Sequence, residues 1–141
     1  MNKVKLEIEA HSENVSMARV VAATFITPYD PTVEEVSDLK TAVSEAVTNA
    51  IIHGYNENGG IVSLIFSAEN RVITVEIADK GIGIENIETA REPLFTTKPE
   101  MERSGLGFTV MEEFMDSVEV QSTAGEGTTV TMTKELRGAV E

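Results

Sequence analysis

The sequence contains no cysteine, which excludes disulfide bonds and thiolate metal sites. Its two histidines, His11 and His53, are too few for a histidine-rich metal site. Basic residues are also scarce, because 11 Lys and Arg stand against 24 Asp and Glu, for a net charge of −13. This balance argues against direct binding to nucleic acid, whose phosphate backbone requires a basic surface.

Long apolar runs are also absent. No stretch reaches the length of a membrane span, and the first ten residues, MNKVKLEIEA, alternate instead of forming the apolar segment of a signal peptide. We therefore expect a soluble, cytoplasmic protein with no membrane contact. The length of 141 residues predicts one compact domain over residues 1–141, which can bury a core without disulfides.

The segment that organises the chain is a predicted helix over residues 33–53. Thr32 and Glu35 form a capping-box pattern at its start. Glu45, Asn49 and His53 recur every four residues, so that they share one stripe with a rise of about 6 Å between neighbours. An Asn oxygen can bind a hard cation such as Mg²⁺, and a Glu can accept a proton from an attacking hydroxyl. The alternative is a solvated edge of an amphipathic helix.

Alternation of apolar and polar residues predicts five strands. They cover residues 4–10, 61–68, 72–78, 117–122 and 128–133. The first strand is expected at an edge of the sheet, where its free backbone groups could pair with another copy of the chain. A further helix is expected over residues 14–26 with Ser12 as its N-cap, and residues 134–141 are expected to form a frayed tail.

Two glycine-containing turns are candidates for ligand contact. Asp79 ends a predicted strand and is followed by Gly81 and Gly83, which would let a ligand approach the backbone closely, although short aspartate turns are common in loops. Residues 104–107, Ser-Gly-Leu-Gly, precede a predicted helix over 108–115 and could bind phosphate or simply enter that helix. The polar segment 93–104 between them is expected to be a lid or a linker.

Four blocks of residues resemble, in this order, the GHKL ATP-binding superfamily of gyrase-type ATPases, Hsp90, histidine kinases and MutL. The blocks are Glu45…Asn49…His53-Gly54, Asp79-Lys80-Gly81-Ile82-Gly83, Ser104-Gly105-Leu106-Gly107 and Gly127-Thr128-Thr129. The resemblance implies an α/β sandwich of the Bergerat type, which is a mixed, mostly antiparallel sheet with helices on one face. ATP would be held between the helices and a lid.

Two further runs, residues 93–98 and 102–108, resemble the stand-alone anti-sigma serine kinases. Within that group the sequence is most similar to the anti-sigma F family of sporulating Bacillus-type bacteria. This resemblance implies a homodimer that binds a sigma factor. It also implies a serine kinase that phosphorylates an anti-anti-sigma protein, with ATP and Mg²⁺.

The resemblance implies roles for residues of the central helix and of the aspartate turn. Asn49 would bind the Mg²⁺ that bridges the phosphates, and Glu45 would be the catalytic general base that accepts the proton of the partner's serine hydroxyl. Asp79 would accept a hydrogen bond from the adenine amine, with Gly81 and Gly83 allowing close approach.

Further contacts with ATP are implied for the second half of the chain. The residues implied to line the triphosphate are Ser104, Gly105, Leu106 and Gly107. Lys98 and Arg103 would neutralise the phosphates, and Thr129 would close the adenine pocket. For His53, a structural hydrogen bond at the helix end and a contact with ATP both remain open. Arg19 would contact the sigma factor.

Three alternatives remain. The chain could be a pure ATPase whose Glu45 activates water, or a nucleotide-binding interaction module without turnover. Within the kinase class, the sigma factor could belong to a stress response instead of sporulation.

Overall fold

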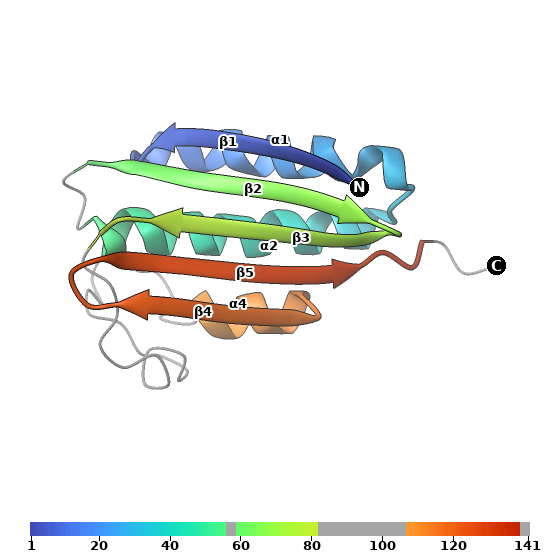
Figure 1. The fold of residues 1–141 in the computed structure, drawn as a ribbon. Helices are drawn as coiled ribbons and strands as arrows, with labels where there is room; N and C mark the ends of the chain where they lie inside the picture. The colour runs from blue at the N-terminus through green and yellow to red at the C-terminus, as the bar shows by residue number, and fades with distance from the viewer. Residues whose placement is uncertain (56–58, 82–106, 139–141) are drawn as a thin grey trace.

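The computed structural model describes residues 1–55, 59–81 and 107–138, and of His53, Gly54 and Gly107 it describes the backbone alone. Five strands form one sheet in the order β1-β2-β3-β5-β4, and the four pairings are all antiparallel (Figure 1). The strands are β1 (Asn2–Glu9), β2 (Ile61–Glu69), β3 (Val72–Asp79), β4 (Ser117–Thr123) and β5 (Gly127–Glu135). The predicted sheet is therefore confirmed.

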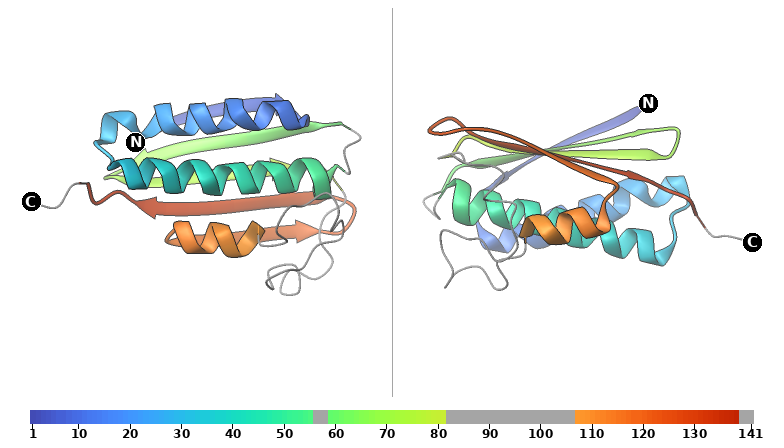
Figure 2. Two further views of the ribbon diagram at one scale, coloured as in Figure 1. Left: turned by 180° about the vertical axis from the view of Figure 1, so that it is seen from behind. Right: turned by 90° about the horizontal axis from the view of Figure 1, so that it is seen from below.

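In the described part of the chain, three α-helices cover one face of the sheet (Figure 2). They are α1 (Val15–Ile26), α2 (Val33–Asn49) and α4 (Gly107–Phe114), and α2 lies in the middle, in contact with both of the others. Alternate residues of β2 and β3 point into the core beneath this layer, as Leu64, Phe66 and Val75 show by their full burial. None of the helices in the described part of the chain combines the length and the apolar character that a membrane span requires.

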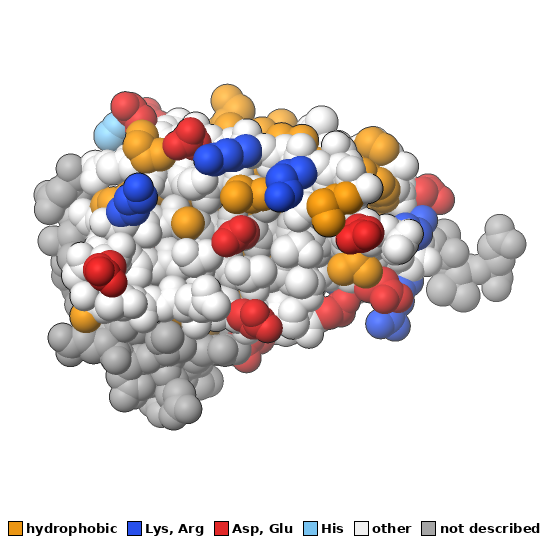
Figure 3. All heavy atoms as spheres, viewed as in Figure 1, with side chains coloured by type: hydrophobic (Ala, Val, Ile, Leu, Met, Phe, Trp, Pro, Cys, Tyr) orange, Lys and Arg blue, Asp and Glu red, His pale blue; other side chains and the backbone are white. Residues whose placement is uncertain are grey.

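The opposite face of the sheet carries no helix within the described residues, and Figure 3 looks directly onto it. Most of its side chains are Ser, Thr or charged, because the core-facing positions alternate with such residues along the strands, but Ile61, Ile65 and Val72 also lie on this face. The architecture is thus a two-layer α+β sandwich with one open sheet face.

Local sequence explains the β2–β3 hairpin. Asn70 and Arg71 both have positive φ angles (51° and 67°), which suits the two-residue turn that matches strand twist. Arg71 is held there by its side chain, whose Nε donates to the carbonyl oxygen of Leu136 at 2.9 Å. The predicted partition of β3 into a buried face and an outer face is confirmed.

The predicted capping box at the start of α2 is also confirmed. The Thr32 hydroxyl accepts a hydrogen bond from the Glu35 N–H at 3.0 Å, and Glu35 Oε1 accepts one from the Thr32 N–H at 2.9 Å. The Glu35 carboxylate additionally accepts hydrogen bonds from the N–H groups of Arg137 (2.7 Å) and Gly138 (3.3 Å).

Two local predictions are wrong. Ser12 does not cap α1, because residues 12–14 form a 3₁₀ turn and Asn14 precedes the helix, donating its side-chain N–H to the Glu9 carbonyl at 2.9 Å. Residues 134–138 are not a frayed tail, because β5 continues to Glu135 and Leu136 is 3% exposed. The tail residues pair with Arg71 and Glu35, which are distant in sequence and therefore invisible to local patterns.

Candidate functional site

The C-terminal half of α2 carries the first part of the candidate site. Glu45 and Asn49 lie one helical turn apart and are both half-buried, while Ala46, Val47 and Ala50 between and beside them are buried in the core. The packed neighbours fix the helix, so that the two polar side chains have a defined position at its edge. A carboxylate and a carboxamide are thus held side by side on one rigid element.

The helix then widens into a π-helical turn over Ala50–Gly54. The N–H of Tyr55 donates to the carbonyl oxygen of Ala50, five residues earlier, at 3.0 Å. Such wide turns often occur at functional sites. Because the periodicity changes here, the four-residue stripe of Glu45 and Asn49 does not extend regularly to His53, whose side chain lies outside the described residues.

Asp79 supplies the second part of the site, at the end of β3. It has the same parity as the buried Ile73, Val75 and Ile77, so it lies on the helix-covered side of the sheet. Its Oδ1 accepts a hydrogen bond from the N–H of Gly81 at 2.9 Å. Burial raises the pKa of Asp79 above its ordinary value, although backbone hydrogen bonds from Gly81 and Thr128 oppose the shift.

The two parts lie at the same end of the molecule. The π-helical turn contacts both β3 and β5, and the C-terminal end of α2, the end of β3 and the start of β5 lie together in Figures 1 and 2. The structure therefore brings Glu45, Asn49, Asp79 and Gly81 to one edge of the sandwich.

Thr129 is not placed beside Asp79. In the register of β3 and β5, Asp79 lies opposite Thr128, whereas Thr129 lies opposite Ala78 on the other face of the sheet. Directly opposed residues of an antiparallel pair share a face, and successive residues alternate. The threonine that shares the face of Asp79 is therefore Thr128, whereas Thr129, which was predicted to close the adenine pocket, lies on the open face.

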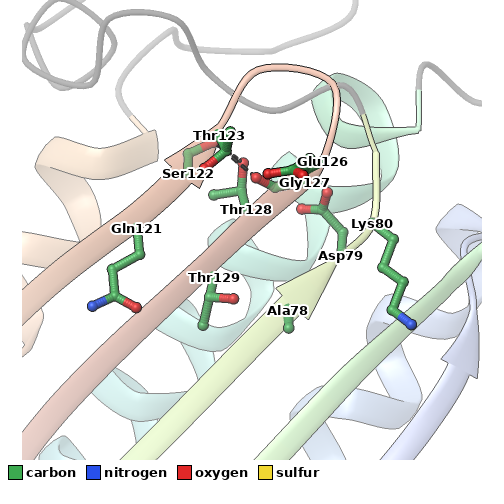
Figure 4. A pocket seen from close by; sticks show the side chains of 10 residues that line it. All are labelled: Ala78, Asp79, Lys80, Gln121, Ser122, Thr123, Glu126, Gly127, Thr128 and Thr129. Carbon is green, nitrogen blue, oxygen red and sulfur yellow. Dashed lines mark hydrogen bonds between the residues drawn. The ribbon is translucent and has the colours of Figure 1, made fainter.

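Thr128 belongs to a short polar row that crosses three strands. Its hydroxyl lies 2.8 Å from the hydroxyl of Ser122 on β4, and Ser122 also donates to the carbonyl oxygen of Gly127 at 2.9 Å (Figure 4). Ser122, Thr128 and Asp79 follow one another across β4, β5 and β3. This row fixes the position of the Thr128 hydroxyl next to the carboxylate.

Gly127 allows β5 to pass close to the end of β3. Its φ is +117°, and a Cβ atom there would collide with the Asp79 carbonyl oxygen and lie 2.8 Å from the Lys80 Cα. Only glycine satisfies both the backbone conformation and this contact. The glycine of the fourth sequence block is therefore required by the packing of the aspartate turn.

Tyr55 is a residue of the site that sequence reasoning missed. Its hydroxyl donates to the Ile61 carbonyl at 2.6 Å and accepts from the Lys80 N–H at 2.7 Å, so that it ties the end of the central helix to the aspartate turn. The ring lies over Gly60, where a Cβ atom would come within 2.5 Å of Tyr55 Cε1. No local pattern predicts this bridge, because its partners are six and 25 residues away.

A hollow of about 350 Å³ lies at the same end of the sheet (Figure 4). Its lining comes from the ends of β3, β4 and β5, and consists of Ala78, Asp79, Lys80, Gln121, Ser122, Thr123, Glu126, Gly127, Thr128 and Thr129. It includes residues of the open face and does not reach Glu45 or Asn49, so it is only one border of the candidate site. The volume of the hollow falls within the range of small-molecule pockets.

Several predicted residues lie outside the described residues: Gly83, Lys98, Arg103, Ser104, Gly105 and Leu106. Gly107 begins α4. Arg19 is exposed on α1, which α2 separates from α4 (Figure 2). The predicted contact of Arg19 with a sigma factor therefore concerns a different surface from the candidate site.

The donor set suits a nucleotide that arrives with its own cation. Within the described residues no group of three His, Cys, Asp or Glu side chains could hold a metal ion. Mg²⁺ usually keeps several waters and binds few protein oxygens together with substrate phosphates, so a site without an acidic cluster is compatible with it. Asp79, Thr128 and the Gly81 backbone offer the acceptors and close approach that an adenine ring needs.

Comparison with known proteins identifies the family. A family model described as the histidine kinase-like ATPase domain matches residues 8–134. An anti-sigma F factor of Clostridium acetobutylicum is 57% identical over 96% of this chain and 94% of its own length. This chain belongs to the anti-sigma F factor family. The anti-sigma F factor of Bacillus subtilis is 54% identical, with 96% of this chain and 93% of the relative covered.

Solved structures agree on the fold. The RsbU and RsbW domains of Rv1364c from Mycobacterium tuberculosis align with a TM-score of 0.69 and 16% identity, covering all of this chain and 35% of that chain. The catalytic domain of histidine kinase ThkA aligns with a TM-score of 0.59 and 16% identity, covering 96% and 97% of the two chains. The predicted Bergerat-type fold is thus confirmed for this member of the anti-sigma F factor family.

Proposed function

We propose that this chain is a cytoplasmic anti-sigma factor that binds and inhibits the sporulation sigma factor F as a homodimer. We also propose that it is a serine kinase that phosphorylates an anti-anti-sigma protein with Mg-ATP. The observation that carries the proposal is the pairing of Glu45 with Asn49 on a helix that ends beside Asp79, in a chain more than half identical to proteins named anti-sigma F factor.

Each described residue has a role that fits its surroundings. Asp79 accepts the adenine amine, because it is a half-buried carboxylate that accepts backbone hydrogen bonds from Gly81 and Thr128 and has oxygen lone pairs left for a further donor. Thr128 adds a hydroxyl on the same face, and Tyr55 holds the Lys80 backbone in place. Adenine recognition thus depends on groups that the fold positions in advance.

The phosphate end of the site depends on α2. Asn49 would hold Mg²⁺ through its carboxamide oxygen, and the bound ion would supply neutralisation of the phosphate charge. Glu45, one turn earlier, accepts the proton of the serine hydroxyl as it attacks. An acidic protein of net charge −13 benefits from a nucleotide that carries its own cation, because bare triphosphate would be repelled. Gly107 at the start of α4, together with Gly83, Lys98, Arg103, Ser104, Gly105 and Leu106, is proposed to complete the phosphate site.

A phosphotransfer assay tests this function. The chain is incubated with labelled ATP, Mg²⁺ and a candidate anti-anti-sigma protein, and label on a serine of that protein is measured beside free phosphate. We expect transfer to serine, and a rate about 10²- to 10⁴-fold lower for Glu45→Gln with ATP binding retained, because a general base typically contributes that much. Phosphate released into solution without protein labelling would instead favour an ATPase. If neither labelled protein nor free phosphate formed, the result would favour a binding module.

A pull-down completes the assignment. Sigma F should co-purify with the chain, and a stress-response sigma factor offered at equal concentration should not. The opposite preference would contradict the sporulation assignment while leaving the kinase assignment intact.

A further inference from the structure

Two hydroxyl groups meet on the helix-covered side of β4 and β5. Ser122 Oγ lies 2.8 Å from Thr128 Oγ1, directly opposite it in the register of the two strands. Ser122 Oγ also lies 2.9 Å from the carbonyl oxygen of Gly127 (Figure 4). Both side chains are half-buried and line the hollow at this end of the sheet. Because β5 lies between β3 and β4, Thr128 has Asp79 on one side and Ser122 on the other.

The hydroxyl protons of this pair are assigned by counting donors. A hydroxyl has one proton and two lone pairs, whereas a carbonyl oxygen can only accept. The contact with Gly127 therefore uses the proton of Ser122, and the contact between the two hydroxyls must use the proton of Thr128. This is the arrangement that satisfies both hydrogen bonds. Thr128 thus donates its hydroxyl proton to Ser122, away from Asp79.

The carbonyl group of Gly127 is held in place by its surroundings. Gly127 is buried, and its φ of +117° is one that side chains other than glycine rarely adopt. Its backbone packs against the aspartate turn so closely that a Cβ atom would lie 2.8 Å from the Lys80 Cα. A peptide group confined in this way keeps one orientation, so the acceptor for the Ser122 proton is built into the fold.

The backbone donor of Thr128 is also in use. Its N–H hydrogen bonds to the Asp79 carboxylate, which accepts a second hydrogen bond from the Gly81 N–H at 2.9 Å. Thr128 therefore directs one donor to Asp79 and the other to Ser122. The Asp79 carboxylate and the Thr128 hydroxyl together form an acceptor edge, because these two groups offer a ligand oxygen lone pairs alone.

We propose that Ser122 is a specificity-determining residue, which makes the site select 6-aminopurine over 6-oxopurine nucleotides by keeping the Thr128 hydroxyl an acceptor. Ser122 acts through Thr128, so it is a positioning residue. The two N–H groups of a 6-amino group match the acceptor edge. A 6-oxo group would bring its own lone pairs against those of Asp79 and Thr128 and leave them unpaired, which strongly disfavours binding. This inference rests on the proposed function, in which Asp79 accepts the adenine amine.

Removal of the Ser122 hydroxyl has opposite consequences for the two classes of purine. A hydroxyl proton rotates to suit its partners. Without Ser122 as acceptor, the Thr128 proton would turn toward the ligand, where it competes with an amine but donates to a 6-oxo group. A substitution that only loosened the strand would weaken the binding of both purines equally. The direction of the two changes therefore separates a role in specificity from a role in folding.

Calorimetric titration of the wild type and Ser122→Ala with three nucleotides tests this role. The ligands are the Mg²⁺ complexes of ATP, inosine triphosphate and purine riboside triphosphate, which carries only hydrogen at position 6. Ser122→Ala should bind ATP about 3- to 5-fold more weakly and inosine triphosphate equally or up to about 3-fold more tightly. The preference for ATP should therefore fall about 5- to 10-fold, with purine riboside triphosphate unchanged. An equal loss for all three nucleotides, or an unchanged preference, would overturn the proposal.

Three further variants confine the effect to the hydroxyl pair. Ser122→Thr keeps the hydroxyl and should keep the wild-type preference. Ser117→Ala is the matched control, because Ser117 pairs with the Thr133 hydroxyl across the same two strands, on the open face. It should not change the preference. Added to Thr128→Val, Ser122→Ala should cause no further change, and an undiminished effect in that background would contradict an action through Thr128.

The wild type separates this inference from the proposed function. A wild type that binds none of the three nucleotides would refute the proposed ATP site itself. A wild type that binds ATP and inosine triphosphate equally well would refute the acceptor edge. If the wild type prefers ATP and phosphorylates the serine, while Ser122→Ala keeps the full preference, the role of Ser122 alone is refuted.

Discussion

The two ends of helix α2 use similar chemical groups for different purposes. At the N-terminal end, the Glu35 carboxylate accepts hydrogen bonds from three backbone N–H groups, those of Thr32, Arg137 and Gly138. At the C-terminal end, Asp79 lies beside the π-helical turn and its side chain accepts backbone hydrogen bonds from Gly81 and Thr128. One carboxylate is saturated by the fold, and the other retains capacity for a ligand.

The pKa shifts of the two acids follow this difference. Burial acts to raise the pKa of Glu35, but the backbone hydrogen bonds from Thr32, Arg137 and Gly138 outweigh it, so the pKa is lowered. For Asp79 burial is larger than the opposing hydrogen bonds, and the pKa is raised. An acid with a lowered pKa stabilises the fold in its charged form, whereas the charged form of an acid with a raised pKa costs stability.

The largest expected effect on ATP binding is at Asp79. Asp79→Asn should weaken ATP binding about 10- to 100-fold, because one amide oxygen cannot serve both the Gly81 N–H and the adenine amine as a carboxylate does. The free energy of unfolding should be equal to or higher than that of the wild type near pH 7, because a charge with a raised pKa is removed. Calorimetric titration with ATP and urea unfolding measure the two quantities, with exposed Asp30→Asn as a charge-matched control.

Glu35 should show the reverse pattern. Glu35→Gln should lower the free energy of unfolding by about 1–2 kcal/mol near pH 7 and leave ATP affinity unchanged, because a neutral amide satisfies fewer of the three donors. Since the pKa of Glu35 is lowered, its contribution is fully present above the ordinary glutamate pKa and is lost as pH falls through the lowered value. Urea unfolding at a series of acidic pH values should therefore show wild type and variant converging, and a constant gap would contradict this account.

A matched pair of threonines tests the assignment within the site. Thr128→Val should weaken ATP binding by about 5- to 10-fold through loss of one hydroxyl next to Asp79, whereas Thr129→Val should not change it. Both substitutions keep the β-branched shape, so the strand is preserved. An equal loss of ATP affinity in both variants would contradict the assignment of the ligand to the face of β5 that carries Thr128.

The smallest expected effect is at Tyr55. Tyr55→Phe removes the bridge between Ile61 and Lys80, where water can partly replace it, so ATP affinity should fall by only about 3- to 5-fold. Tyr29→Phe, whose ring packs on Phe25, is the control and should leave the affinity unchanged. A fall in unfolding free energy of Tyr55→Phe with no change in ATP affinity would assign this residue to the fold and not to the site.

Much of the fold follows from local pattern. The capping box at Thr32, the alternation of β3 and the turn at Asn70 are encoded within a few residues, and the structure has all of them. The frayed tail was wrong because its partner Glu35 lies 102 residues from Arg137. The Ser12 cap was wrong because a 3₁₀ turn over Ser12–Asn14 intervenes before α1.

The candidate site likewise contains residues that the sequence predicts and residues that it does not. Glu45, Asn49 and Asp79 stand in recognisable blocks, but Thr128 and Thr129 are neighbours whose faces depend on strand register. The apolar residues Val130 and Met132 were a usable signal, since their parity places Thr128 and not Thr129 on the covered side. Tyr55 offered no signal, because its bridge forms only after the helix end and two strand ends have come together.

The order of the strands has a consequence for how the chain folds. The β2–β3 and β4–β5 hairpins close locally. In contrast, the pairing of β1 with β2 must close a loop of residues 10–60, and the pairing of β5 with β3 must close one of residues 80–126. Contacts over such separations form slowly because of their loop-closure entropy. Until β1 docks, the outer edge of β2 stays open, and in a crowded solution the first β1 to reach it can belong to a different molecule, which gives a domain-swapped pair.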